Sequence, residues 1–333
     1  MKKTTKIFSS ALAILLIAVL SLGLFSCAKQ PTVDKTLDIN VTVLSGTTGF
    51  GMAPLMQSAA DGSVGLNYHF TVESDASNVT AGLIQGKIDI AALPTNAASV
   101  LYNKTKGEVQ LLALNTRGVL YLLDGADQRI SSFADLRGKT VAVPAQNPTF
   151  IFSYLCEKNG LTVGKDIFID NSYTSPAELQ ANVASGQVSL AVLPEPMVTI
   201  TKASNQAVKV VLDLTAEWDK VSPAGSLVQG CVVVRREFAE AHPAEVKKFL
   251  EEYEASVGEV ISSPETAAEK IAAQGIFAKA AVAQKAIPNC NLCFVTGDDM
   301  KSAMQEFLNI MLKVQPASIG GAVPGDDFYY IAK

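Results

Sequence analysis

The sequence contains few of the residues on which metalloenzymes and hydrolases depend. Its 333 residues include two histidines, His69 and His242, and five cysteines. Two imidazoles are too few for a histidine-rich metal centre, and no Ser–His–Asp or Cys–His set, glycine-rich nucleotide loop or metal-spaced cluster can be recognised. We expect His69, in an apolar strand, to be a satisfied core residue and His242, before Pro243, to cap a helix. The composition thus favours a binding protein without metal or cofactor over an enzyme.

Positive charge and long apolar runs are also scarce. Lys and Arg number 27 against 32 Asp and Glu, which gives a formal net charge of −5 at pH 7. Nucleic-acid binding requires clustered cations that neutralise phosphates, so the charge balance excludes nucleic acid as a partner. After residue 26, no apolar run is long enough to span a bilayer.

The first residues form a targeting segment. Lys2, Lys3 and Lys6 precede an apolar run over 11–25, which is too short to span a bilayer comfortably. The run ends in Leu24-Phe25-Ser26-Cys27, which is similar to a bacterial lipobox, although Phe25 is bulkier than usual there. We therefore predict a lipoprotein signal peptide over 1–26, lipid attachment at Cys27, a tether over 27–37, and a location on the extracytoplasmic side of the cell membrane. The alternative is an ordinary secretory signal that ends near a cysteine.

The other four cysteines carry no clear chemistry. Cys290 and Cys293 have the spacing of a redox or zinc half-site, but no second pair and no histidine cluster accompany them. A local disulfide or two reduced thiols are therefore favoured over a metal site. Cys156, on a predicted helix, and Cys231, at the start of a predicted strand, are expected to be small buried side chains.

The most informative feature is an internal repeat at an offset of one hundred residues. Nine identities over 54 residues, without a gap, exceed the roughly three expected at ordinary residue frequencies. The matched positions are Val41, Val43, Phe50, Leu55, Ala81, Gly86, Ala91, Leu93 and Pro94, which recur as Val141, Val143, Phe150, Leu155, Ala181, Gly186, Ala191, Leu193 and Pro194. Two similar lobes imply a cleft between them, and clefts between domains are where small ligands bind.

Each repeat predicts alternating strands and helices. The alternation favours an α/β fold in which each lobe is a mostly parallel sheet flanked by helices. The predicted strands are 38–44, 67–73, 88–93, 110–114, 119–123, 140–143, 167–171, 188–193, 208–212 and 231–234, and the predicted helices are 50–60, 77–86, 150–159, 177–185, 242–254, 264–274, 279–286 and 297–314. Ser77 or Asn78 is the expected N-cap of its helix.

The lobe boundaries follow from a crossover that we place at Gly125-Ala126-Asp127. Lobe 1 then comprises 38–124 and 225–333, and lobe 2 comprises 125–224. The strand over 231–234 is predicted to return to the first lobe.

Three stretches resemble a known family. They are Leu136-Arg137-Gly138-Lys139-Thr140-Val141-Ala142-Val143, the stretch from Ala181 to Pro196, and the stretch from Val233 to Leu250. Together they are similar to the substrate-binding proteins of ABC importers, in the branch of nitrate, sulfonate, taurine and thiamine-pyrimidine binders. The resemblance implies a two-lobed, type II-like periplasmic-binding-protein fold, a small-molecule ligand, a membrane permease as partner, and a monomer. Ser189 and Met197 depart from the family pattern, which leaves the ligand class open.

The ligand is expected in the turns that follow the strands of both lobes, where helix N-termini present free N–H groups. Hydroxyl and amide side chains add adjustable donors there, and aromatic rings can clamp a flat ligand. Arg117 is a candidate cation, with a surface ion pair as its alternative, and Glu195 could accept a hydrogen bond from an amine or ring N–H, or face solvent. The predicted ligand-binding residues are Thr47, Thr48, Phe50, Pro94, Thr95, Asn96, Arg117, Gln146, Asn147, Thr149, Phe150, Tyr173 and Glu195.

These residues constrain the ligand only to a small organic molecule that is anionic or heteroaromatic, such as a sulfonate or a pyrimidine. Core packing is the alternative role for the repeated phenylalanines. Two other functions share the same cleft: an enzyme of menaquinone or thiamine-pyrimidine biosynthesis, since fold alone does not settle activity, and a ligand-sensing lipoprotein.

Overall fold

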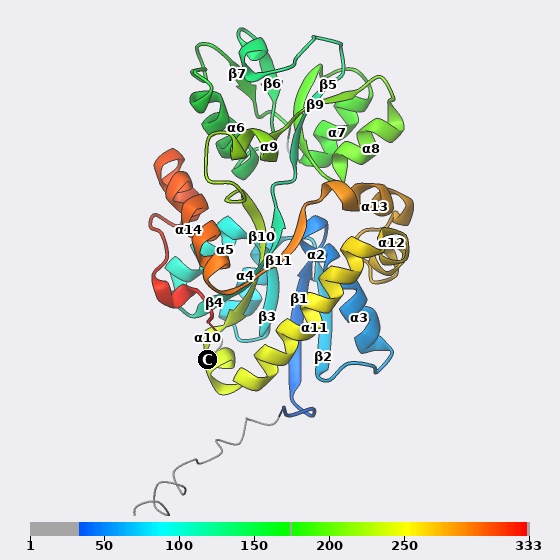
Figure 1. The fold of residues 1–333 in the computed structure, drawn as a ribbon, viewed down its shortest axis with the longest axis vertical. Helices are drawn as coiled ribbons and strands as arrows, with labels where there is room; N and C mark the ends of the chain where they lie inside the picture. Colours follow the sequence, from blue (N-terminus) through cyan, green and yellow to red (C-terminus); the bar gives the residue numbers. More distant parts are fainter. Residues whose placement is uncertain (1–32, 174, 332–333) are drawn as a thin grey trace, which may run out of the picture. The chain divides into compact units, whose positions relative to one another are not determined.

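The computed structural model describes residues 33–173 and 175–331 and contains two sheets flanked by helices (Figure 1). The predicted signal peptide, Cys27 and most of the tether lie outside the described residues. The strands are β1 (Asp38–Leu44), β2 (Asn67–Glu73), β3 (Ile90–Pro94), β4 (Val109–Arg117), β5 (Leu120–Asp124), β6 (Thr140–Ala142), β7 (Phe168–Asp170), β8 (Leu190–Pro194), β9 (Lys209–Asp213), β10 (Val228–Arg235) and β11 (Leu292–Val295).

The helices are mostly those predicted from the sequence. They are α2 (Thr47–Phe50), α3 (Ala53–Ala60), α4 (Ala76–Ile84), α5 (Thr95–Thr105), α6 (Asn147–Lys158), α7 (Pro176–Ala184), α8 (Met197–Ser204), α9 (Leu214–Asp219), α10 (Arg236–Ala241), α11 (Pro243–Ser262), α12 (Pro264–Ala273), α13 (Ala280–Ala286) and α14 (Gly297–Val314). The helix predicted over 50–60 is divided into α2 and α3, because Phe50 ends one helix and Pro54 starts the next. Asp75 caps α4 by accepting from Ser77 N, so the predicted caps at Ser77 and Asn78 are wrong.

The two sheets share one topology. The first has the order β11-β4-β10-β3-β1-β2 and the second the order β7-β6-β8-β5-β9. Strands β1, β2, β3 and β4 correspond in place and direction to β6, β7, β8 and β9, and one antiparallel strand, β10 or β5, fills the same position in each sheet. The predicted two-lobed α/β fold is therefore confirmed, and the strand of 231–234 returns to the first sheet as expected.

The antiparallel strands are exchanged between the lobes. Strand β5 follows β4 in sequence but pairs with β8 and β9 of the second sheet. Our boundary at 124–125 is therefore misplaced, since the chain leaves the first sheet after Arg117 and enters the second at Leu120. Residues 118–119 form the first crossover between the lobes, and residues 220–227, which lead from α9 to β10, form the second.

The crossovers determine which edges of the two sheets face each other. Leu120 enters the second sheet opposite Pro194, at the end of β8, and Gly230 lies opposite Pro94, at the end of β3. The parallel strands of both lobes thus point their carboxyl ends toward the crossovers. Ligands of open α/β sheets bind outside these ends, so we expect a ligand on this side of both sheets.

Hydrogen bonds join each crossover to a strand that adjoins the other crossover. Val119 N donates to Gln229 Oε1 at 2.8 Å, and Arg117 Nη1 donates to the Gly225 carbonyl at 3.1 Å. Gly118 lies so close to Thr215 and Leu227 that any added Cβ would collide with both. A glycine is therefore required where the first crossover passes the second.

One buried cluster extends from the first lobe into the second. It joins residues of the first sheet, such as Leu111, with residues of the second, such as Val192. Trp218 lies at the junction, fully buried between Tyr154 of α6 and Phe307 of α14. The lobes are therefore connected by shared apolar packing as well as by the two crossovers.

The two histidines and the four described cysteines lie in positions that indicate no catalytic role. Of these residues, His69 differs from our expectation. His69 is an exposed partner of Asp38 at 2.8 Å and not a core residue, because alternate side chains of β2 point to solvent. His242 is the N-cap residue of α11 but makes no side-chain capping bond, and its ring packs on Phe238. Cys156 and Cys231 are buried as expected, and Cys290 and Cys293 are free thiols.

Within residues 33–173 and 175–331, no helix has the length and apolar character needed to cross a bilayer.

Candidate functional site

The turns after β1 and β6 are equivalent positions of the internal repeat. Gly46 precedes α2 with φ 90° and ψ −162°, and Gln146 precedes α6 with φ 67° and ψ −129°. The two residues are one hundred positions apart and both have positive φ. For glycine this conformation carries no steric penalty, but for glutamine it costs about 1–3 kcal/mol. Strained side-chain-bearing residues of this kind gather at binding sites, so Gln146 is the strongest single indicator of the site.

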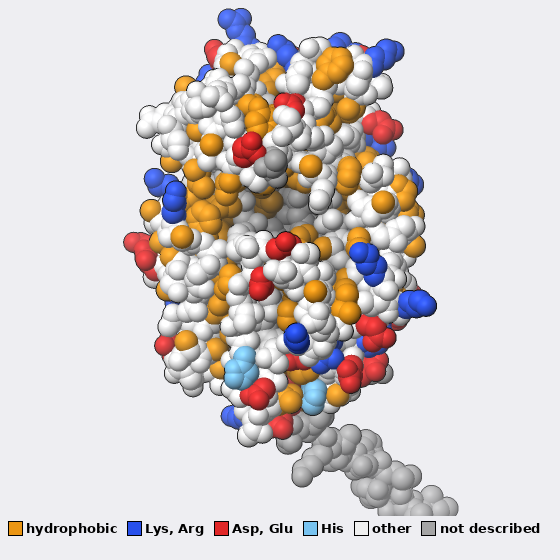
Figure 2. Space-filling model, turned by 180° about the vertical axis from the view of Figure 1, so that it is seen from behind, with side chains coloured by type: hydrophobic (Ala, Val, Ile, Leu, Met, Phe, Trp, Pro, Cys, Tyr) orange, Lys and Arg blue, Asp and Glu red, His pale blue; other side chains and the backbone are white. Residues whose placement is uncertain are grey.

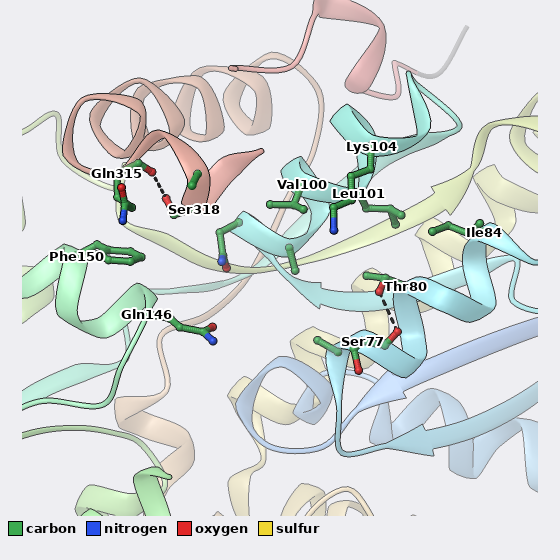
Figure 3. Close-up of a pocket in the computed structure, with 14 residues that line it drawn as sticks. Ser77, Thr80, Ile84, Val100, Leu101, Lys104, Gln146, Phe150, Gln315 and Ser318 are labelled. Carbon is green, nitrogen blue, oxygen red and sulfur yellow. Dashed lines mark hydrogen bonds between the residues drawn. The ribbon is translucent and has the colours of Figure 1, made fainter. Parts of the chain in front are cut away.

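A pocket of about 460 Å³ lies beside this strained turn (Figure 3). Helices α4 and α5 of the first lobe form one wall, α6 of the second lobe forms the other, and Gln315, Ala317 and Ser318 close one end. The volume falls within the range of sites that hold small organic molecules. Figure 2 shows that one face of the molecule is hollowed, with hydrophobic side chains around the hollow.

The pocket contains three of the residues predicted from the sequence. Asn96 comes from the first turn of α5, and Gln146 and Phe150 come from the start of α6. The Oδ1 atom of the adjacent Asn147 is buried and has no hydrogen-bond partner among the described residues. An unsatisfied buried acceptor beside a pocket is what a ligand N–H or O–H would satisfy.

Two predicted residues are not exposed to the cleft. Phe50 is fully buried and packs against Phe277, with ring centroids 6.1 Å apart. Thr95 is also fully buried, and its hydroxyl donates to the Val228 carbonyl at 2.8 Å. In this conformation neither offers surface to a ligand, and Phe150 is the member of the repeated pair that lines the pocket.

Thr47, Thr48, Pro94 and Thr149 are not among the residues that line the pocket. Thr47 and Thr48 form the first turn of α2, and the Thr48 carbonyl accepts from Asn115 Nδ2 at 3.0 Å. Pro94 is the N-cap residue of α5. Thr149 is held by the Pro144 carbonyl and by Asn171.

Tyr173 and Arg117 lie in two other parts of the structure. Tyr173 is half-buried against the smaller core of the second lobe. Arg117 reaches across to the second crossover and lines a separate pocket behind it, with Cys293. Its position indicates that Arg117 links the crossovers, and no surface ion pair of the kind we considered is among the described residues' ion pairs.

Glu195 is buried at the end of β8, with 3% of its surface exposed. Its carboxylate accepts hydrogen bonds from Thr199 N at 3.1 Å and Thr199 Oγ1 at 3.0 Å. Burial raises the pKa of Glu195 above its ordinary value of 4.5, although the bonds from Thr199 act in the opposite direction. The carboxylate also lies near Tyr121 of β5, whose hydroxyl donates to the Asn289 carbonyl at 2.8 Å.

Residues of α4 and α5 were missed by the sequence analysis. Thr80, Val100 and Lys104 line the pocket. Thr80 lies in the helix predicted over 77–86 but was not predicted to bind ligand, whereas the helix that carries Val100 and Lys104 was not predicted. The helical spacing of Ala98, Leu101 and Thr105 after Pro94 was the available signal.

The described residues contain no group of three or more His, Cys, Asp or Glu side chains that could hold a metal ion. Thiol chemistry is also disfavoured, because burial raises the pKa of Cys156 to about 12 and that of Cys293 to about 11. The site therefore offers hydrogen bonds and apolar surface, and we find no activated nucleophile in it.

Gly46 and Gln146 occupy equivalent positions of the repeat. Replacing each by the other's residue type should change the free energy of unfolding in opposite directions. Gln146→Gly is expected to raise the free energy of unfolding by about 1 kcal/mol, because it removes the positive-φ strain at some cost in chain entropy. Gly46→Gln is the reciprocal control and should lower it by about 1–3 kcal/mol, since its Cβ meets open space and only the backbone conformation opposes it. Urea unfolding measures both. If both variants change the free energy of unfolding by the same amount in the same direction, the backbone at Gln146 is not strained.

The pH dependence of stability should report the buried carboxyl of Glu195. Because the pKa of Glu195 is higher in the folded protein than in the unfolded chain, its stabilising contribution is complete below pH 4.5 and declines as pH rises through the folded pKa. The stability of the wild type minus that of Glu195→Gln should therefore fall with pH above 4.5 and then level off. Glu157→Gln, at an exposed position, is the control variant. A flat difference for Glu195→Gln would contradict the assignment.

A family profile described as "NMT1/THI5 like" matches residues 63–267, whereas comparison with curated protein sequences gave no match.

Solved structures show the same fold at low sequence identity. A protein from Parabacteroides distasonis described as an ABC transporter has a TM-score of 0.76 at 23% identity, over 90% of this chain and 100% of its own. The periplasmic aliphatic sulphonate binding protein SsuA from Escherichia coli has a TM-score of 0.71 at 14% identity, over 89% and 92%. A ligand-binding component of an ABC-type import system from Staphylococcus aureus, with zinc bound, has a TM-score of 0.66 at 15% identity, over 89% and 97%.

Proposed function

Since the chain belongs to the NMT1/THI5-like family, we propose that it is an extracytoplasmic solute-binding protein that delivers a small organic ligand to an ABC importer. The observation that carries the proposal is the pocket itself, which is lined by residues of both lobes. The low-identity structural neighbours described as ABC import components agree with this function.

Delivery would work by closure of the lobes. A ligand held by Asn96 of the first lobe can contact Gln146 and Phe150 of the second only when the lobes approach each other. Contacts made in the closed form alone shift the population toward that form. The permease would then recognise a surface that exists only in the loaded protein.

The ligand is a small organic molecule, anionic or heteroaromatic. Asn96, Gln146 and Asn147 supply neutral amide groups that can donate or accept, and Phe150 offers a flat apolar face. A sulfonate-like ligand fits a neighbour described as a sulphonate-binding protein, and a pyrimidine-like ligand fits the Phe150 face.

The N-terminal sequence completes the proposal. We propose that Cys27 carries a lipid that anchors a monomer to the outer face of the cell membrane, and that the residues up to 37 form the tether. Near the start of the described residues, Asp34 N donates to the buried carboxylate of Glu245 at 2.7 Å, so the chain at Asp34 is held to the first lobe.

Native mass spectrometry of the full chain, extracted from its own membranes with mild detergent, tests the proposal. We expect the mature mass to include a lipid at Cys27 and the folded protein to carry a small solute in a one-to-one ratio. The released solute should raise the melting temperature when it is added back. If the protein converts the solute into a product, the enzyme alternative is correct; if it retains no solute from any growth condition, solute binding is excluded.

A further inference from the structure

The pocket between α5 and α6 has walls that suit a carbon chain. Val100 and Leu101 of α5, Phe150 of α6 and Ile84 of α4 line it. Ile84 is 60% exposed, the largest exposed fraction among the large hydrophobic side chains of the described residues. An apolar side chain left open on the wall of a pocket loses free energy to water that an apolar ligand group would recover.

The charge of the same pocket has one sign. Lys104 is the one charged residue among those that line it, and no Asp or Glu is present. Among the described residues Lys104 has neither an ion-pair partner nor a hydrogen bond from its side chain. Lys104 also stabilises the C-terminal end of α5 through the helix dipole, so a test must separate affinity from stability.

The two polar ends of the pocket are separated along α5. Asn96 is in the first turn of this helix and Lys104 in the last. Eight residues of α-helix span about 12 Å, and Val100 and Leu101 lie between the two ends. A molecule that reaches from Asn96 to Lys104 therefore passes the apolar side chains of Val100 and Leu101, which line the same pocket.

We propose that the ligand is an elongated organic acid with three parts: a polar head at Asn96 and Gln146, an apolar arm along α4, α5 and α6, and an anionic end at Lys104. This inference rests on the proposed function and adds the ligand class. The arm contacts Val100 of the first lobe and Phe150 of the second, so a longer arm also favours the closed form.

Isothermal titration of the full chain with unbranched carboxylates of four to eight carbons tests the arm and its anionic end. We expect the Kd to fall about fourfold for each added methylene until the pocket is filled. An alkylammonium ion of the same length should bind at least tenfold more weakly than the carboxylate. Ala97→Trp, on the wall of the pocket, should abolish the dependence on chain length. Ala81→Trp, on an exposed face of α4 outside the pocket, should retain it.

A second pair of variants tests Lys104. Lys104→Gln should weaken octanoate binding about tenfold and leave octanol binding unchanged, whereas the exposed control Lys87→Gln should change neither. Urea unfolding of Lys104→Gln separates loss of helix stability from loss of affinity. An affinity that does not depend on chain length, no binding of any carboxylate, or equal effects of the two lysine variants would each overturn the inference. The proposed function would still stand if native mass spectrometry shows a retained solute, and would fail with the inference if none is retained.

Discussion

Replacing Asp89 by alanine is expected to lower the free energy of unfolding by about 3 kcal/mol. Asp89 is 5% exposed at the start of β3. Its Oδ2 accepts from Asn40 N at 2.9 Å and from Asn40 Nδ2 at 3.2 Å, and its Oδ1 accepts from Arg235 Nη2 at 2.9 Å. The variant leaves the Asn40 N–H without its acceptor and removes one of the three acceptors of a largely buried guanidinium, and unsatisfied buried groups of this kind are costly.

Glu237→Ala is the matched control, because it removes another carboxylate from the same arginine. Glu237 accepts from Arg235 Nη1 at 2.9 Å, but its side chain is 83% exposed. Solvent screens such a pair, so the loss should be less than about 1 kcal/mol. Urea unfolding followed by the fluorescence of the single tryptophan measures both variants. Equal losses would show that burial of Asp89 does not determine its contribution.

Replacing Trp218 by alanine is expected to cost about 3–5 kcal/mol. Trp218 is fully buried, its ring packs on Tyr154 at 4.8 Å and on Phe307 at 6.1 Å between centroids, and its Nε1 donates to Ser226 Oγ at 2.8 Å. Tyr154 belongs to the second lobe, Phe307 to α14, and Ser226 to the second crossover. The variant therefore leaves a cavity where the two lobes meet. It also removes the hydrogen bond from Trp218 to Ser226 of the second crossover.

Trp218→Phe separates these two effects, since it keeps an aromatic ring but loses the bond to Ser226. Its cost should be about 1–2 kcal/mol, the sum of a lost buried hydrogen bond and a small change in packing. Circular dichroism must replace fluorescence as the probe, because both variants lack the only tryptophan. A Trp218→Ala variant as stable as Trp218→Phe would contradict the role of this ring at the junction.

The local pattern of the sequence predicted most elements of the fold, and the repeat predicted that the lobes would correspond. Val41 and Val141 lie on equivalent strands because the same pattern of buried and exposed residues forms the same sheet twice. The exchange of β5 and β10 could not be predicted, since strand pairing is a non-local property and 120–124 has the same apolar composition as a strand of either sheet. Strand β11 was missed because Leu292–Val295 is short and half-buried at a sheet edge.

The site was predicted less completely than the fold. Asn96, Gln146 and Phe150 were identified because they follow strands in both repeats, and the structure places them at one pocket. The repeat alone could not distinguish Phe50 from Phe150, although one is in the core and the other at the pocket, because the burial of Phe50 involves Phe277, which lies outside the repeat. The positive φ of Gln146 could not be predicted either. Glutamine has no preference for this backbone conformation, which the surrounding structure imposes.

Small-angle X-ray scattering of the full chain, with and without the solute that it retains, tests the central claim most directly. If the lobes close on a solute that contacts both Asn96 and Gln146, the radius of gyration must decrease at saturation and return when the solute is removed. A radius that stays the same at saturating solute, with binding confirmed by calorimetry on the same sample, would contradict closure and with it the function proposed for this cleft.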